Sequence, residues 1–134
     1  MKILYVSNSI IPSKFANSIN VMKMCQAFAN NGHDVTLLVP DRKTEFTNRS
    51  VDVYDYYGVK KNFTIKKLWY PNLKGNIIIY LLGILFYLIK NSNFKLIYGR
   101  FLAGCYLAAI LGKDVIFESH DPIYKRKNIT ARIN

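Results

Sequence analysis

Polar and charged side chains follow three short apolar runs, each of which predicts a β-strand. The runs end at Ser7-Asn8, at Gly99-Arg100 and at Glu118-Ser119-His120-Asp121. Hydroxyl, amide and guanidinium groups bind sugar hydroxyls and phosphates, whereas carboxyl and imidazole groups exchange protons. We therefore expect a binding or catalytic site wherever the fold brings these three ends together.

His120 is the candidate catalytic residue. It follows a predicted strand, lies between Glu118 and Asp121, and precedes Pro122, which favours an extended turn. An imidazole there is able to hydrogen-bond a sugar hydroxyl or orient a leaving group. The alternative is a structural role, which is common for a single histidine in a loop. For His33, at a helix-to-strand turn, a structural contact is the preferred interpretation.

Two further features suggest an anionic ligand. A helical pattern begins near Ser18, so the backbone N–H groups around Asn17 and Ser18 are able to meet a phosphate, unless Ser18 only caps its own helix. Arg100 suits an anion, but a salt bridge to Glu118 or Asp121 explains it equally well. The predicted substrate-binding residues are Ser7, Asn8, Asn17, Ser18, Arg100, Glu118 and Asp121.

A parallel sheet would bring these residues together. Residues 2–40 predict strand, loop, helix and strand, because apolar side chains recur at helical spacing from Val21 to Ala29 and residues 35–39 are continuously apolar. Asn31-Gly32 is a typical helix end. Two such strands joined by a helix form a right-handed βαβ unit.

The remaining elements alternate in the same way. We expect a third strand near residues 63–66, an apolar helix capped by Asn76 and ending near Asn91, a strand at 96–98, a helix at 102–111 and a buried strand at 115–118. This pattern predicts one α/β domain, a Rossmann-like, doubly wound parallel sheet with strand order 3-2-1-4-5. Ligands of such sheets bind at the carboxyl ends of the strands near the reversal of order.

Charge and cysteine content restrict the possible partners. The 134-residue chain has a formal net charge of +11, and no Asp or Glu lies between Tyr56 and Lys113. A region of one charge sign attracts anionic lipid, nucleic acid or phosphorylated ligands, although it also suits a solvated surface.

Cys25 and Cys105 lie in apolar patterns that predict buried, reduced thiols. No Cys/His cluster predicts a metal site.

The longest apolar run, residues 77–89, is too short to cross a bilayer, because a helix of that length spans about 20 Å. We expect it to be buried or to lie on a membrane surface. An anionic membrane is a candidate partner, since Trp69 and Tyr70 accompany nearby cations: Lys60, Lys61, Lys66, Lys67 and Lys74. The start of the chain has no secretory signal, which predicts a cytoplasmic location, with peripheral membrane contact.

Several chemistries lack their usual motifs. The first loop contains no glycine, which disfavours NAD or FAD, and no Walker phosphate loop is present. Two histidines without a strained nucleophile motif predict no Ser-His-Asp triad. The scattered tyrosines match no base-stacking signature, which disfavours nucleic acid as a partner, although a basic nucleic-acid-binding protein remains an alternative.

Four segments together resemble the N-terminal half of glycosyltransferase family 4, which has the GT-B architecture. They are the opening strand at residues 2–6, the helix and Gly-His-x-Val-Thr turn at 26–38, the strand and trailing arginine at 96–100, and the Glu-x-His-Asp strand end at 113–121. The turn is the most specific match. The first loop departs from the family, since Ala16-Asn17-Ser18 replaces its frequent Gly-Gly pair.

The resemblance implies a retaining transferase, without a catalytic metal, that moves a sugar from a nucleotide-sugar to an acceptor. The resemblance also implies a role in polysaccharide or glycolipid synthesis, for which a lipid-linked acceptor is a candidate. This domain would bind the acceptor, His120 would contact the donor sugar or its phosphate, and residues 13–18 would approach the diphosphate. The expected C-terminal donor-binding domain, with its Glu-x7-Glu motif, does not follow, so the chain alone is expected to be inactive. The alternative is a non-catalytic module for a phosphorylated ligand or an anionic membrane.

Overall fold

The first strand of the chain lies at the centre of a sheet in which every strand is parallel. The structure, a computed structural model, describes residues 1–42 and 52–118. The five described strands have the order β3-β2-β1-β4-β5, which confirms the predicted order 3-2-1-4-5. The elements are β1 (Lys2–Val6), α1 (Ala16–Asn30), β2 (Asp34–Pro40), α2 (Val53–Tyr57), β3 (Thr64–Leu68), α3 (Asn76–Lys90), β4 (Leu96–Gly99), α4 (Leu102–Ile110) and β5 (Val115–Phe117).

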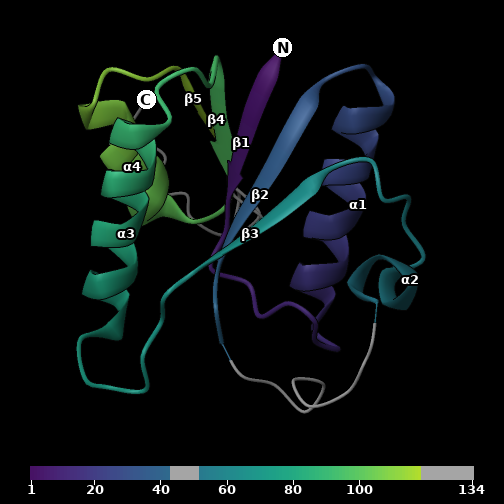
Figure 1. Cartoon of the computed structure of the whole chain (residues 1–134), viewed down its shortest axis with the longest axis horizontal. Helices are drawn as coiled ribbons and strands as arrows, with labels where there is room; N and C mark the ends of the chain where they lie inside the picture. Colours follow the sequence, from purple (N-terminus) through teal and green to yellow (C-terminus); the bar gives the residue numbers. More distant parts are fainter. Residues whose placement is uncertain (43–51, 119–134) are drawn as a thin grey trace, which may run out of the picture.

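Helices cover both faces of the sheet. Figure 1 shows α1 and α2 on one side and α3 and α4 on the other. On the first side Tyr5, Leu37 and Val39 pack under α1, whose Val21, Met22 and Cys25 are buried, as predicted. On the second side Leu4, Val6 and Leu38 pack under α3 and α4. Consecutive side chains of β1 therefore point into the hydrophobic cores on opposite faces of the sheet, as expected for a parallel strand that is covered by helices on both faces.

Three local predictions about these elements are wrong. Asn76 does not cap α3, because Gly75 occupies the N-cap with φ at 77° and Asn76 is the first helical residue. Ser18 does not cap α1, because the helix begins at Ala16 and the Ser18 hydroxyl donates to the Phe15 carbonyl at 2.7 Å. β5 was expected to be buried, yet Ile116 and Phe117 are 50% and 42% exposed. This strand lies at the end of the described sheet, where no neighbouring strand covers it.

Candidate functional site

The predicted meeting of strand ends is found at the carboxyl edge of β1, β4 and β5. Val6 pairs with Gly99, and Gly99 pairs with Phe117, so the residues that follow these strands leave the same edge. The Glu118 N–H donates to the Gly99 carbonyl at 2.8 Å. Ser7, Arg100 and Glu118 therefore follow three adjacent strands. The order of the strands reverses between β1 and β4, the position at which doubly wound sheets bind ligands.

Gly99 allows the two central strands to approach closely at this edge. A Cβ atom built at this position would lie 2.1 Å from the Val6 carbonyl oxygen, much closer than a van der Waals contact. Any side chain would therefore push β4 away from β1. The absence of a side chain sets the spacing between the strands that carry Ser7 and Arg100.

Glu118 is held by two donors at this edge. Arg100 Nη2 donates to Glu118 Oε1 at 2.9 Å, and the hydroxyl of Tyr98 donates to Glu118 Oε2. Of the alternatives for Arg100, the salt bridge to Glu118 is therefore the one present in the structure. Burial, followed by the hydrogen bond and the negative charge of Glu118, raises the pKa of Tyr98 to about 12.

Two other donors beside this cluster have no partner. Tyr5 is fully buried and its hydroxyl makes no hydrogen bond. The Nε atom of Arg100 is also buried and makes none, although the Arg100 side chain as a whole is partly exposed. The ring of Tyr5 packs against that of Tyr98 with centroids 5.2 Å apart. Arg100 and Glu118 act on the pKa of Tyr5 in opposite directions, although burial is the main reason that this pKa is raised. A buried donor without an acceptor is costly, so these two groups mark a locally unfavourable polar environment beside the Arg100–Glu118 pair.

A second hydrogen-bond network joins the end of β1 to the first turn of α1. The Ser7 hydroxyl donates to Ser9 Oγ at 2.8 Å, the Ser9 N–H donates to Ser7 Oγ at 3.0 Å, and Asn17 Nδ2 donates to Ser9 Oγ at 2.8 Å. Tyr80, from α3, donates its hydroxyl to the Ser7 carbonyl. Ser7 and Asn17, both predicted site residues, thus belong to one network.

A pocket of about 310 Å³ opens beside this network. No side chain caps the N-terminus of α1, and its first turn holds no acidic residue, which suits an anion. Ser18 contributes little, because it is fully buried and its hydroxyl bonds to Ser13, Phe15 and Tyr57. The lining residues are Asn8, Ser9, Ile10, Phe15, Asn17, Ser18 and Arg42.

Larger hollows do not coincide with the polar strand ends. One of about 860 Å³ lies along α2 and β3, and one of about 630 Å³ lies around Trp69 and Tyr70. The first is wide open to solvent, and neither contains Ser7, Arg100 or Glu118. We therefore place the candidate site by its unpartnered donors and strand ends rather than by volume.

Some predicted residues lie elsewhere or were missed. His120 and Asp121 are outside the described residues. Tyr5 and Tyr98 were missed because each lies within an apolar run, although a phenolic hydroxyl in a buried strand is itself a signal, since it needs a polar partner. Arg42 follows β2 at the same edge, so the strand-end rule would have found it. Within residues 1–42 and 52–118, no group of three His, Cys, Asp or Glu side chains could hold a metal ion.

The fold and this edge define a Rossmann-like α/β domain. No family model and no curated protein matches the chain. Among solved structures, the chain is similar to the C-terminal domain of a hydrogenase from Pyrococcus furiosus, with a TM-score of 0.53 and 12% sequence identity over 87% of this chain and 90% of that one. At this identity the similarity shows the arrangement of the sheet and its helices alone.

Proposed function

We propose that this chain is the acceptor-side domain of a retaining glycosyltransferase that uses a nucleotide-sugar donor. The observation that carries the proposal is the 2.9 Å ion pair between Arg100 and Glu118. These residues belong to two separate motifs of the family that the sequence resembles, and they meet at the edge where doubly wound sheets bind ligands. Arg100 is only partly buried, so its guanidinium is able to hold Glu118 and still reach a ligand oxygen with other N–H groups.

In this proposal the polar edge forms one wall of a cleft and a donor-binding domain forms the other. Acceptor hydroxyls would be held by the groups at the ends of β1, β4 and β5. The pocket beside α1, with Arg42 and Asn17, would face the donor diphosphate. Transfer breaks the bond between the anomeric carbon and the phosphate oxygen and forms one to the acceptor oxygen with the same anomeric configuration. This domain supplies binding and orientation for that step.

An NMR titration of the isotope-labelled chain tests the proposal. We expect oligosaccharide acceptors to shift the amide signals of Tyr5, Ser7 and Glu118, and Arg100→Lys, which keeps the charge but loses the planar guanidinium that holds Glu118, to weaken binding about tenfold. Lys23→Gln, an exposed cation on α1, is the matched control and should bind normally. The isolated chain should transfer no sugar. Signals that never respond to any sugar, or turnover by the isolated chain, would contradict the proposal.

The second candidate is a non-catalytic module that binds a phosphorylated ligand. The uncapped N-terminus of α1 and the nearby Arg42 favour it. The same titration separates the two candidates, because pyrophosphate alone would then saturate the pocket beside α1 and added sugar would change nothing. Arg42→Gln would weaken that binding, whereas Arg100→Lys would leave it nearly unchanged.

A further inference from the structure

Helix α3 is apolar on the side that faces solvent as well as on the side that faces the sheet. Tyr80, Ile84 and Leu88 are buried against the core. On the outer side lies a second apolar stripe, whose side chains are 49–68% exposed: Ile78, Leu82, Phe86 and Ile89. A helix that is hydrophobic all round is normally surrounded by apolar material. The outer side of α3 therefore lacks the water-facing polar residues of an ordinary surface helix.

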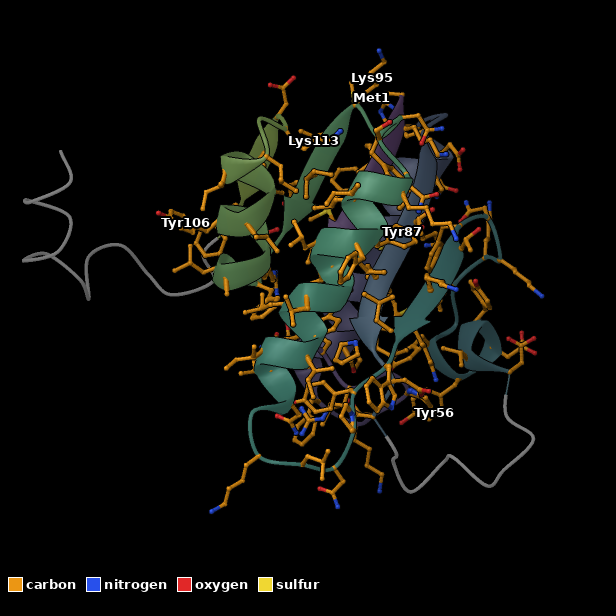
Figure 2. The ribbon with its side chains drawn as sticks, turned by 60° about the vertical axis from the view of Figure 1, so that its left-hand side comes forward. Met1, Tyr56, Tyr87, Lys95, Tyr106 and Lys113 are labelled. Atoms are coloured by element: carbon orange, nitrogen blue, oxygen red, sulfur yellow. The ribbon has the colours of Figure 1, made fainter. Side chains whose placement is uncertain are left out.

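The neighbouring helix α4 continues this surface. Leu102, Tyr106 and Ile110 recur at four-residue spacing and are 61–67% exposed. Figure 2 shows α3 and α4 side by side on the same face of the sheet, with Tyr106 directed away from it. We define the α3–α4 face by its seven exposed apolar residues: Ile78, Leu82, Phe86, Ile89, Leu102, Tyr106 and Ile110. Grouped exposed apolar side chains of this size mark an interaction surface, unlike scattered single ones.

The charges around the α3–α4 face are mostly positive. No Asp or Glu occurs from Tyr57 to Lys113, a segment that includes both helices and the residues between them, and Asp114 is the one acidic residue in the loop after α4. Lys74 precedes α3, Lys90 ends it, and both are exposed. Lys113 follows α4 and donates to the Ser92 carbonyl at 3.0 Å. The apolar surface is thus bordered by cations.

We propose that the α3–α4 face docks on the surface of an anionic lipid bilayer, with both helices lying along it. Apolar side chains would enter the interface and the bordering lysines would meet lipid phosphates, a combination that suits an interfacial helix. Among the described residues no helix is long and apolar enough to cross a membrane, and α3, with 15 residues, spans about 22 Å. The proposal does not depend on the proposed function.

Charge argues against a second copy of the chain as the occupant. Two copies joined through this face would bring together surfaces bordered by lysines, and each copy carries a formal charge of +11. Like charges facing one another oppose such a contact. An anionic bilayer satisfies both the apolar stripes and the cations.

The structure also changes which lysines we expect to bind the anionic bilayer. The sequence suggested Lys60 and Lys61, but these lie on the α1 side, where the Lys60 N–H donates to Gln26 Oε1 and Lys61 lies over the ring of Tyr54. Lys74 and Lys90, at the two ends of α3, are the relevant exposed cations. Removing one cation near an anionic surface weakens binding about fivefold.

Co-sedimentation of the full chain with vesicles tests this inference. With vesicles of roughly two-thirds phosphatidylcholine and one-third phosphatidylglycerol at low salt, we expect binding that is lost at high salt or with phosphatidylcholine alone. Leu82→Gln/Phe86→Gln should weaken binding more than tenfold, and Lys90→Gln about fivefold. Lys23→Gln, which removes an exposed lysine from the helix on the opposite face, should have no effect.

Circular dichroism shows whether each variant is folded, so that loss of binding is not mistaken for unfolding. Equal binding to neutral vesicles, or equal effects of Lys23→Gln and Lys90→Gln, would overturn the proposal. So would a concentration-dependent dimer that Leu82→Gln/Phe86→Gln abolishes in a chain that does not bind vesicles, because a second copy would then occupy the face.

Discussion

Helices α1 and α3 cover opposite faces of one sheet and have the same length, 15 residues, yet their outer surfaces differ. The outer side of α1 carries Asn20, Lys23 and Asn30, whereas that of α3 carries Leu82 and Phe86. On the side that packs against the sheet, both helices carry apolar side chains. The outer side of each helix is not constrained by the sheet, so this difference is the one expected if α1 faces water and α3 docks on an apolar surface as proposed above.

Buried polar groups are distributed unequally as well. On the α1 side the Tyr57 hydroxyl accepts from the Ser13 N–H at 2.8 Å and lies 3.0 Å from Ser18 Oγ. On the α3 side Tyr80 bonds to backbone carbonyls at the ends of β1 and β2. The first side of the molecule thus supplies the polar setting of the candidate site, and the second supplies an apolar surface. Ligand binding and docking need not compete.

The largest expected effect separates the two sides of α3. Ile84→Ala removes a fully buried side chain and should lower the free energy of unfolding by about 2–5 kcal/mol. Leu82→Ala, on the outer side, should change it by no more than about 0.5 kcal/mol, because Leu82 is half exposed. Urea unfolding without lipid measures both. Similar losses for the two variants would mean that the outer side of α3 is packed against protein.

A smaller effect compares two buried hydroxyls. Tyr57→Phe leaves the Ser13 N–H buried without its acceptor and should cost about 1–3 kcal/mol. Tyr80→Phe removes a donor from the Ser7 and Leu38 carbonyls. It should cost less, about 0.5–1.5 kcal/mol, because a buried carbonyl tolerates the loss of one donor better than a buried N–H tolerates the loss of its acceptor, and the Leu38 carbonyl still accepts from the Ser7 N–H at 3.0 Å. Urea unfolding again gives the values. A larger loss of unfolding free energy for Tyr80→Phe than for Tyr57→Phe would contradict this ranking of the two hydroxyls.

The titration of the Tyr98 hydroxyl tests its contact with Glu118 at the polar edge. Its pKa rises from 10.0 to about 12, so the folded state favours the neutral phenol. The resulting stability is fully present below pH 10 and is lost as the pH rises through about 12. The difference in tyrosinate absorbance between the wild type and Tyr98→Phe should show this midpoint. Glu118→Gln should lower it, because the charge of Glu118 contributes to the shift; an unchanged midpoint would contradict the contact.

The smallest effect concerns the two thiols, one under each helical layer. Burial raises the pKa of Cys105 to about 11 and raises that of Cys25 further. A thiol reagent at pH 8 should therefore label both slowly, with Cys105 first. If the α3–α4 face docks on lipid, anionic vesicles should slow labelling of Cys105 and leave Cys25 unchanged. Equal protection of both thiols would indicate general stabilisation instead.

Most of the sheet could be predicted because its signals are local. Continuous apolar runs bounded by polar or turn residues marked the strands, and the rule for parallel connections gave their order. The N-cap of α3 at Gly75 could not be predicted, and Asn76 was predicted in its place, since the cap depends on the positive φ of Gly75. The exposure of Ile116 could not either, because it depends on which distant segments cover β5.

The candidate site was predictable in outline. Parallel strands send their carboxyl ends to one edge, so Ser7, Arg100 and Glu118 could be grouped from sequence. The partners within that group could not, because the choice between an anion and a salt bridge for Arg100 depends on side-chain geometry. Tyr5 lies within an apolar run, so the sequence did not mark it as a site residue. That its hydroxyl has no partner can be established only from the positions of the surrounding acceptors.

The central place of β1 has a consequence for synthesis of the chain. Among the described strands β1 is synthesised first, but its β4 neighbour begins only at Leu96. Translation adds about 5–20 residues per second, so the edge of β1 that pairs with β4 stays unpaired for roughly 5–20 s after β1 is synthesised. During that time an apolar strand offers unpaired backbone groups to any other chain nearby. Chaperone contact with the nascent protein should therefore be strongest before β4 emerges.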